Sequence, residues 1–164
     1  MKILILGLGN ILFGDDGIGI YIIRKLKQEV ISRKAENLLR GVDLVETSVS
    51  GLALLDIITG YDRLIIIDTI KKENPKSGKI RTFDIKDLRH IPGPSPHYVS
   101  FPQIFSLGKK VGLKIPSLVK IIAIEAKNIY NLGEGLSVEV ERAIPRVIEE
   151  IKKILSEWNE REDI

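Results

Sequence analysis

The stretch Lys2-Ile3-Leu4-Ile5-Leu6-Gly7-Leu8-Gly9-Asn10 decides the fold. Its apolar run from Lys2 to Gly7 is far shorter than the roughly 18 residues of a membrane span, and it is typical of a strand buried on both faces of a sheet. A glycine-containing turn follows. Apolar residues then recur at helical spacing, which indicates a helix that begins near Asp16 and Gly17. These apolar residues are Ile18, Ile22, Ile23, Leu26 and Val30.

The strand-then-helix pattern repeats along the chain. Residues 42–47 and 64–67 read as further strands, with a helical pattern at 52–58 between them, and 118–124 reads as the last central strand. Strands that alternate with helices favour βαβ units and a parallel sheet. We therefore expect one α/β domain over residues 1–164, with three layers: a mostly parallel, five-stranded twisted sheet and helices on both faces.

Three segments depart from this simple alternation. A polar stretch too short for a crossover precedes residues 80–83, so we expect that strand to run antiparallel to its predecessor at an edge of the sheet. Residues 84–96 read as a long irregular loop that ends in Pro92-Gly93-Pro94-Ser95-Pro96. A helix from about Ser100 to Val111 follows, and a long amphipathic helix begins at Ser137, where Pro145 should kink it.

Composition excludes several classes of protein. With 44% hydrophobic and 29% charged residues, the chain is neither disordered nor a membrane protein. The 25 basic residues nearly balance the 22 acidic ones, without a run of like charge that would indicate a nucleic-acid partner. The chain has no cysteine, which excludes disulfides, thiolate metal sites and cysteine nucleophiles. We expect a cytoplasmic protein that neither inserts into a membrane nor binds nucleic acid.

The first glycine-rich turn resembles a dinucleotide-binding fingerprint only in part. Gly7 and Gly9 match its first two glycines, but Leu12 stands where the third belongs, and the nearest acidic residue on the second strand, Glu46, comes far too late. A tight turn without a nucleotide is the better interpretation.

Two carboxylates follow expected strands. Asp16 lies with Asp15 between Gly14 and Gly17, and Asp68 follows four large apolar residues. In open α/β sheets the crevice beyond the carboxyl ends of the strands binds ligands, which favours a functional role for both. The structural alternatives are a helix cap formed by one aspartate of the Asp15-Asp16 pair, and a turn formed by Asp68 with Thr69.

The chain has only two histidines. His90 stands in a polar context, whereas His97 follows the stiff proline-rich stretch, so we favour His97 over the alternative of a merely structural imidazole. Asp16, Asp68 and His97 together would leave open coordination positions on Ni²⁺, Zn²⁺ or a similar ion, which suits a metal that also contacts substrate.

Other catalytic motifs are missing from the sequence. H-E-x-x-H, G-x-S-x-G and G-x-x-x-x-G-K-[ST] do not occur. Hydroxyl side chains that could act as nucleophiles, none with an evident base, are Ser48, Ser50, Thr69, Ser95 and Ser100.

Several motifs in order resemble the hydrogenase maturation endopeptidases, which process the large subunit of nickel-iron hydrogenases. The resemblance implies a five-stranded twisted sheet with helices on both faces, and it implies that Asp16, Asp68 and His97 form the metal-binding and catalytic set. Many relatives carry Glu where this chain has Asp16, and Asp15 could take part if the loop shifts. The motifs are Ile5 to Gly19, Ile65-Ile66-Ile67-Asp68, Ser95-Pro96-His97, Ile124-Glu125-Ala126 and Gly135 to Val140.

The resemblance also implies a substrate. The peptidase would grasp nickel already inserted in the large-subunit precursor and remove a short carboxyl-terminal extension, so nickel is expected from the precursor, and other divalent ions are expected to substitute in vitro. The composition shows no clear sign of a permanent oligomer, so we expect a monomer. Two alternatives stay open: a maturation chaperone that binds nickel or precursor without cutting, and a metal-dependent hydrolase of another substrate.

Overall fold

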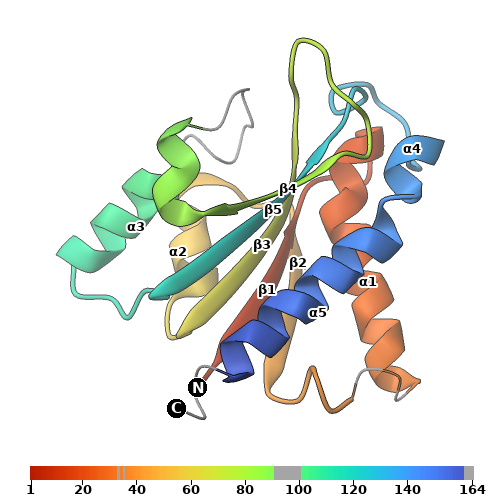
Figure 1. The fold of residues 1–164 in the computed structure, drawn as a ribbon. Coiled ribbons are helices and arrows are strands. Elements are labelled where there is room, and N and C mark those ends of the chain that lie inside the picture. Colours follow the sequence, from red (N-terminus) through yellow and green to blue (C-terminus); the bar gives the residue numbers. More distant parts are fainter. Residues whose placement is uncertain (33, 35, 91–100, 161–164) are drawn as a thin grey trace.

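The computed structural model describes residues 1–32, 34, 36–90 and 101–160. A five-stranded sheet in the order β2-β1-β3-β5-β4 forms its centre (Figure 1). Four strands are parallel, and the edge strand β4 is antiparallel to β5. The strands are β1 (Ile3–Leu8), β2 (Val42–Thr47), β3 (Arg63–Ile70), β4 (Ile80–Asp84) and β5 (Leu118–Glu125). The predicted α/β fold class is confirmed.

Helices cover both faces of the sheet (Figure 1). On one face lie α1 (Ile18–Ile31) and α5 (Ile144–Glu160), and on the other lie α2 (Leu54–Ile58) and α3 (Phe101–Lys110). Shorter helical turns are η1 (Gly14–Gly17), η2 (Gly51–Ala53), η3 (Ile85–His90) and α4 (Val138–Glu141). Within the described ranges, none of the helices combines the length and apolar character needed to span a bilayer.

The alternation of side chains along the strands produces two cores. In β1, Ile3 and Ile5 pack with α1 and α5, while Leu4, Leu6 and Leu8 pack with α2 and α3. All six residues of β1 are buried because both faces of the sheet are covered. The uninterrupted apolar run in the sequence reflects this two-sided burial.

Strand β3 is longer than predicted. Asp68 does not end the strand, which continues to Ile70. The reason is β5, which runs alongside and pairs Asp68 with Ala123 and Ile70 with Glu125, so the backbone there stays in the ladder. The antiparallel direction of β4 and its edge position are confirmed, but its hydrogen-bonded partner is β5 rather than the preceding strand.

Two predictions about loops and helices were also wrong. Of the irregular loop predicted over residues 84–96, Asp84 belongs to β4 and residues 85–90 form the 3-10 helix η3. The rest of that segment, with the proline-rich stretch, lies outside the described residues. Pro145 does not kink a helix, because two helices stand where one was predicted, and it is the second residue of α5. The first turn of a helix tolerates proline, since its amide has no intrahelical partner there.

Close packing of α1 on the sheet positions the end of β1. A Cβ at Gly19 would overlap the carbonyl oxygen of Leu8 and lie 2.8 Å from that of Ile67. Only glycine therefore lets the first turn of α1 approach the carboxyl ends of β1 and β3. This approach brings η1, which carries Asp16, beside β3.

Candidate active site at the carboxyl edge of the sheet

The strand order places the candidate site at a topological switch point. The chain leaves β1 for β2 on one side, whereas β3 is the neighbour of β1 on the other side. Connections that diverge from adjacent parallel strands leave a crevice beyond their carboxyl ends, which is where open α/β sheets bind ligands. Asp16 follows β1 and Asp68 lies near the end of β3, so both predicted carboxylates flank this crevice.

Asp16 is held from two sides in η1. Its Oδ2 accepts a hydrogen bond from the backbone amide of Asn10 at 2.8 Å, and its Oδ1 accepts one from the hydroxyl of Thr69 at 3.1 Å. The residue is only 9% exposed. The N-cap position of α1 is held by Gly17 rather than by an aspartate, and both Asp15 and Asp16 are buried, so the alternative of a helix cap formed by one of the pair does not describe this turn.

Asp68 is fully buried, and its carboxylate is also tied to Thr69. The backbone amide of Thr69 donates to Oδ1 of Asp68 at 2.8 Å. Because successive side chains of a strand point to opposite faces, Thr69 reaches Asp16 on the α1 side while Asp68 lies on the other side. Thr69 thus links the two carboxylates, which are 52 positions apart in the chain.

The structure assigns Asp15 a different role from Asp16. Its carboxylate is buried and accepts hydrogen bonds from Ser137, at 2.6 Å from the backbone amide and 3.0 Å from the hydroxyl. Its own amide donates to the carbonyl of Asn128 at 2.9 Å. Asp15 therefore anchors the loop between β5 and α4 to η1, while its neighbour Asp16 faces β3.

The third predicted site residue, His97, lies outside the described residues, as do Ser95 and Ser100. The backbone of His90 ends η3. Among residues 1–32, 34, 36–90 and 101–160, no group of three or more histidine, cysteine, aspartate and glutamate side chains is arranged to hold a metal ion. The described part of the site is accordingly the pair Asp16 and Asp68 with Thr69.

A hollow of about 240 Å³ opens beside Asp16. Loops that follow β1, β2 and β5 meet around it, and its lining combines polar with large apolar and aromatic residues. Larger hollows of about 400 and 500 Å³ lie near α5 and contain neither predicted carboxylate, so their size does not make them candidates. The hollow, called here the Asp16 pocket, is lined by Gly9, Asn10, Phe13, Asp16, Ser48, Ile129 and Tyr130.

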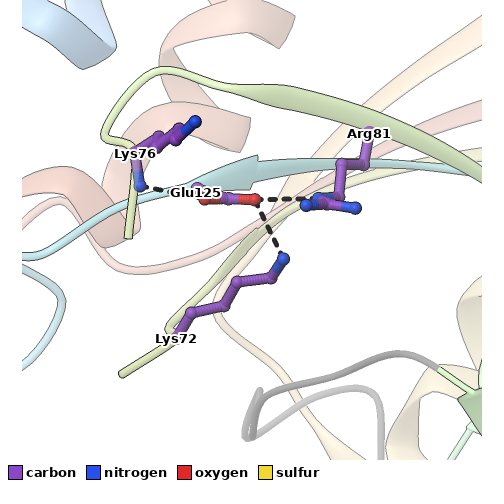
Figure 2. Close-up of polar contacts among 4 residues, drawn as sticks. All are labelled: Lys72, Lys76, Arg81 and Glu125. Atoms are coloured by element: carbon purple, nitrogen blue, oxygen red, sulfur yellow. Dashed lines mark hydrogen bonds and ion pairs between the residues drawn. The ribbon is translucent and has the colours of Figure 1, made fainter. Parts of the chain in front are cut away.

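Glu125 forms a buried ionic cluster at the end of β5 (Figure 2). It is 2% exposed, and its Oε1 lies 2.8 Å from Nε of Arg81 and 3.1 Å from Nζ of Lys72. The backbone amide of Lys76 donates to Oε2 at 2.9 Å. Burial alone would raise the pKa of Glu125, but the hydrogen bonds from Arg81, Lys76 and Lys72 outweigh it and lower the pKa to about 2. The cluster secures the connection between β3 and β4 next to the site.

The lowered pKa predicts an acid-sensitive contribution to stability. The pKa falls from 4.5 in the unfolded chain to about 2, so the stabilisation is complete above about pH 4.5 and is lost as the pH falls toward 2. It amounts to roughly 3 kcal/mol. Urea unfolding from pH 6 down to pH 2 should show a shallower loss of stability in Glu125→Gln than in the wild type. Glu134→Gln, at an exposed loop position, is the control and should keep the wild-type slope.

Sequence reasoning identified the two carboxylates but missed their partners. Thr69 was considered only for a turn or as a hydroxyl without a base, although its place directly after Asp68 in a buried strand is a usable signal. Buried strands rarely carry polar residues without a partner, so an Asp-Thr pair there points to polar contacts across the end of the sheet. Ser137 and the lysines around Glu125 carry no comparable signal, because their partners are distant in sequence.

The fold and this site define a class of proteins, and comparison with known proteins agrees. The chain belongs to the hydrogenase maturation protease (HycI) family, whose model matches residues 20–154. Members of this family are peptide hydrolases that act in hydrogenase maturation, so the predicted family and the predicted enzyme class are confirmed.

Individual relatives cover nearly the whole chain. The hydrogenase 2 maturation protease of Escherichia coli is 28% identical over 159 residues, which are 96% of this chain and 92% of the relative. The structure of the NiFe hydrogenase maturation protease HybD from Thermococcus kodakarensis superposes with a TM-score of 0.73 at 28% sequence identity. The match covers 94% of this chain and 99% of that protein's chain. The maturating endopeptidase HybD from E. coli shares the fold, with a TM-score of 0.76 at 24% identity over 96% and 93% of the two chains.

Proposed function

We propose that this protein removes a short carboxyl-terminal extension from the nickel-loaded precursor of a nickel-iron hydrogenase large subunit, and that it recognises the nickel held by that precursor. The observation that carries the proposal is the pair of buried carboxylates, Asp16 and Asp68, tied to the same threonine at the switch point of the sheet. A buried carboxylate pair is costly unless a positive charge or hydrogen bonds compensate it, and a divalent metal supplies such a charge.

The proposed metal contacts follow from the donor types. Asp16 and Asp68 offer carboxylate oxygens and His97 offers an imidazole nitrogen, a set that binds divalent first-row metals and leaves coordination positions free. Those free positions are needed, since nickel arrives with ligands of the precursor still attached. A complete set of protein ligands would prevent this shared coordination.

The chemical step is hydrolysis of one peptide bond. Nickel polarises either the scissile carbonyl or a bound water, which lowers the barrier to attack. The water oxygen bonds to the carbonyl carbon, the carbon–nitrogen bond breaks, and a proton from the water passes to the departing amine. In the proposal, the carboxylates hold and orient the metal, and the Asp16 pocket receives the chain beside the scissile bond.

The test is the intact mass of a nickel-loaded large-subunit precursor before and after incubation with the protein, with nickel-free precursor alongside. A loss equal to a carboxyl-terminal peptide, seen only with nickel, is the expected result. A stable complex that leaves the precursor uncut would instead indicate a maturation chaperone. Cleavage that is the same without nickel would overturn the role of nickel as the recognition signal.

Thr69 is expected to position the metal-binding carboxylates. Thr69→Val keeps the side-chain shape but removes the hydroxyl that donates to Asp16, so the affinity for Ni²⁺ should fall by about 10–100-fold, the usual effect of losing a group that orients a ligand. Thr69→Ser retains the hydroxyl and is the matched control. Titration of NiCl₂ into each purified variant by calorimetry measures this. Equal affinities for Thr69→Val and Thr69→Ser would exclude a positioning role for the hydroxyl.

A further inference from the structure

Exposed apolar side chains lie on the three connections, including η2, that surround the Asp16 pocket. One connection follows β1, one follows β2 and one follows β5. These connections also contribute Gly9, Ser48 and Tyr130, respectively, to the lining of the pocket. Large exposed apolar groups that are contiguous, rather than scattered, mark interaction sites. These side chains, called here the apolar rim, are Leu12, Val49, Leu52, Tyr130 and Leu132.

Backbone hydrogen bonds hold two of these loops side by side. The amide of Gly133 donates to the carbonyl of Leu12 at 2.8 Å, and the amide of Gly14 donates to the carbonyl of Gly133 at 2.7 Å. Leu12 and Leu132 therefore project from bonded neighbouring segments. Because the backbone is already ordered, binding through this rim loses little further conformational freedom.

Tyr130 connects the rim to the pocket. It is half exposed, yet it also lines the Asp16 pocket, so the two features form one continuous surface. Nζ of Lys71 lies 4.7 Å from the centre of the Tyr130 ring, a cation–π contact that holds the ring from the side of the β3–β4 connection. A molecule bound in the pocket would thus extend over the rim.

We propose that the apolar rim docks onto the folded body of the hydrogenase large-subunit precursor, on an apolar surface next to its metal-bearing tail. This inference rests on the proposed function. Ligand atoms lie about 2 Å from a first-row metal, so nickel shared between the precursor and Asp16 brings the precursor body within about one side-chain length of the pocket. The surface that it meets there is the rim that shares Tyr130 with the pocket.

The experiment compares substitutions in the rim with a control substitution at an equally exposed apolar position outside it. Leu132 in the rim is 80% exposed, and Ile31 at the carboxyl end of α1, away from the site, is 82% exposed. Leu132→Asp should raise the KM for nickel-loaded precursor by about 10-fold or more with little change in kcat, and should raise the Kd of the complex equally. Leu12→Asp should act in the same direction. Ile31→Asp should leave both constants at their wild-type values.

The outcomes separate this inference from the proposed function. If the wild type cleaves but Leu132→Asp and Ile31→Asp have the same KM and Kd, the rim inference is wrong and the proposed function stands. If the wild type binds precursor without cutting it, the proposed cleavage is wrong. The Kd values of Leu132→Asp and Ile31→Asp for the precursor would still test the rim inference. Self-association of the wild type that Leu132→Asp abolishes would overturn the inference, because the rim would then contact a second copy of this chain.

Discussion

Asp68→Asn is expected to lower kcat/KM for nickel-loaded precursor by at least about 100-fold. The amide keeps the size of the carboxylate and an oxygen for the Thr69 amide, but it removes the negative charge that the proposed metal contact needs. Loss of groups that merely orient metal ligands already costs about 10–100-fold, so loss of a ligand charge should cost more. Intact-mass kinetics under single-turnover conditions measure the effect.

The control for this substitution is Asp56→Asn, which makes the same change at an exposed position in α2. Its rate should equal that of the wild type. Asp68→Asn itself should remain folded, because burying a neutral amide costs less free energy than burying a carboxylate. Cleavage by folded Asp68→Asn at the wild-type rate would remove Asp68 from the site.

Gly9→Ala is expected to destabilise the protein by about 2–6 kcal/mol. Gly9 has a φ of +142°, which side chains disfavour, and an added Cβ would overlap the backbone carbonyl oxygen of Asp16. Backbone strain of about 1–3 kcal/mol and overpacking of about 1–3 kcal/mol add here. The overlap is with backbone, so relief requires η1 to move away from β1. Urea unfolding monitored by circular dichroism measures the loss.

Gly41→Ala separates strain from overlap. Gly41 has a φ of +76°, but nothing lies within 4 Å of the position that its Cβ would take. This variant should therefore lose only the strain contribution, which for the left-handed region is about 1–2 kcal/mol. If Gly9→Ala were no less stable than Gly41→Ala, the close approach of Gly9 to the backbone of Asp16 in η1 would not constrain the site. Gly9→Ala that stays folded should also bind nickel less well, because Asp16 would be displaced.

Much of the fold could be predicted because burial leaves a local pattern. Strands β1, β3 and β5 are buried on both faces, so their sequences are nearly uninterrupted apolar runs, and α1 shows its buried stripe at helical spacing. The errors arose where a neighbour decided the outcome. The length of β3 depends on β5, which lies alongside it, and the break before Pro145 depends on where α4 ends.

The candidate site could be predicted only in outline. Asp16 and Asp68 each follow a recognisable strand, and parallel strands bring their carboxyl ends to one edge. The sequence could not show that Asp15 and Asp16 have different roles. The difference depends on the hydrogen bond between Asp15 and Ser137, which are 122 positions apart. Likewise, Glu125 gave no sign of its charged partners, which come from a connection and from the edge strand.

The sequence by itself determined the fold class, the family resemblance and the two carboxylates at strand ends, since all of these depend on local periodicity and on motifs in order. The tertiary structure alone decided that Thr69 joins Asp16 to Asp68, that Asp15 serves the loop after β5, and that three loops enclose one pocket. Those features depend on the strand order and on which segments hydrogen-bond across the edge of the sheet. The contacts of Asp16 with Thr69 and of Asp15 with Ser137 join residues 53 and 122 positions apart. Such contacts leave no periodic trace in the chain, so even where a residue is visibly polar in a buried strand, the sequence does not name its partner.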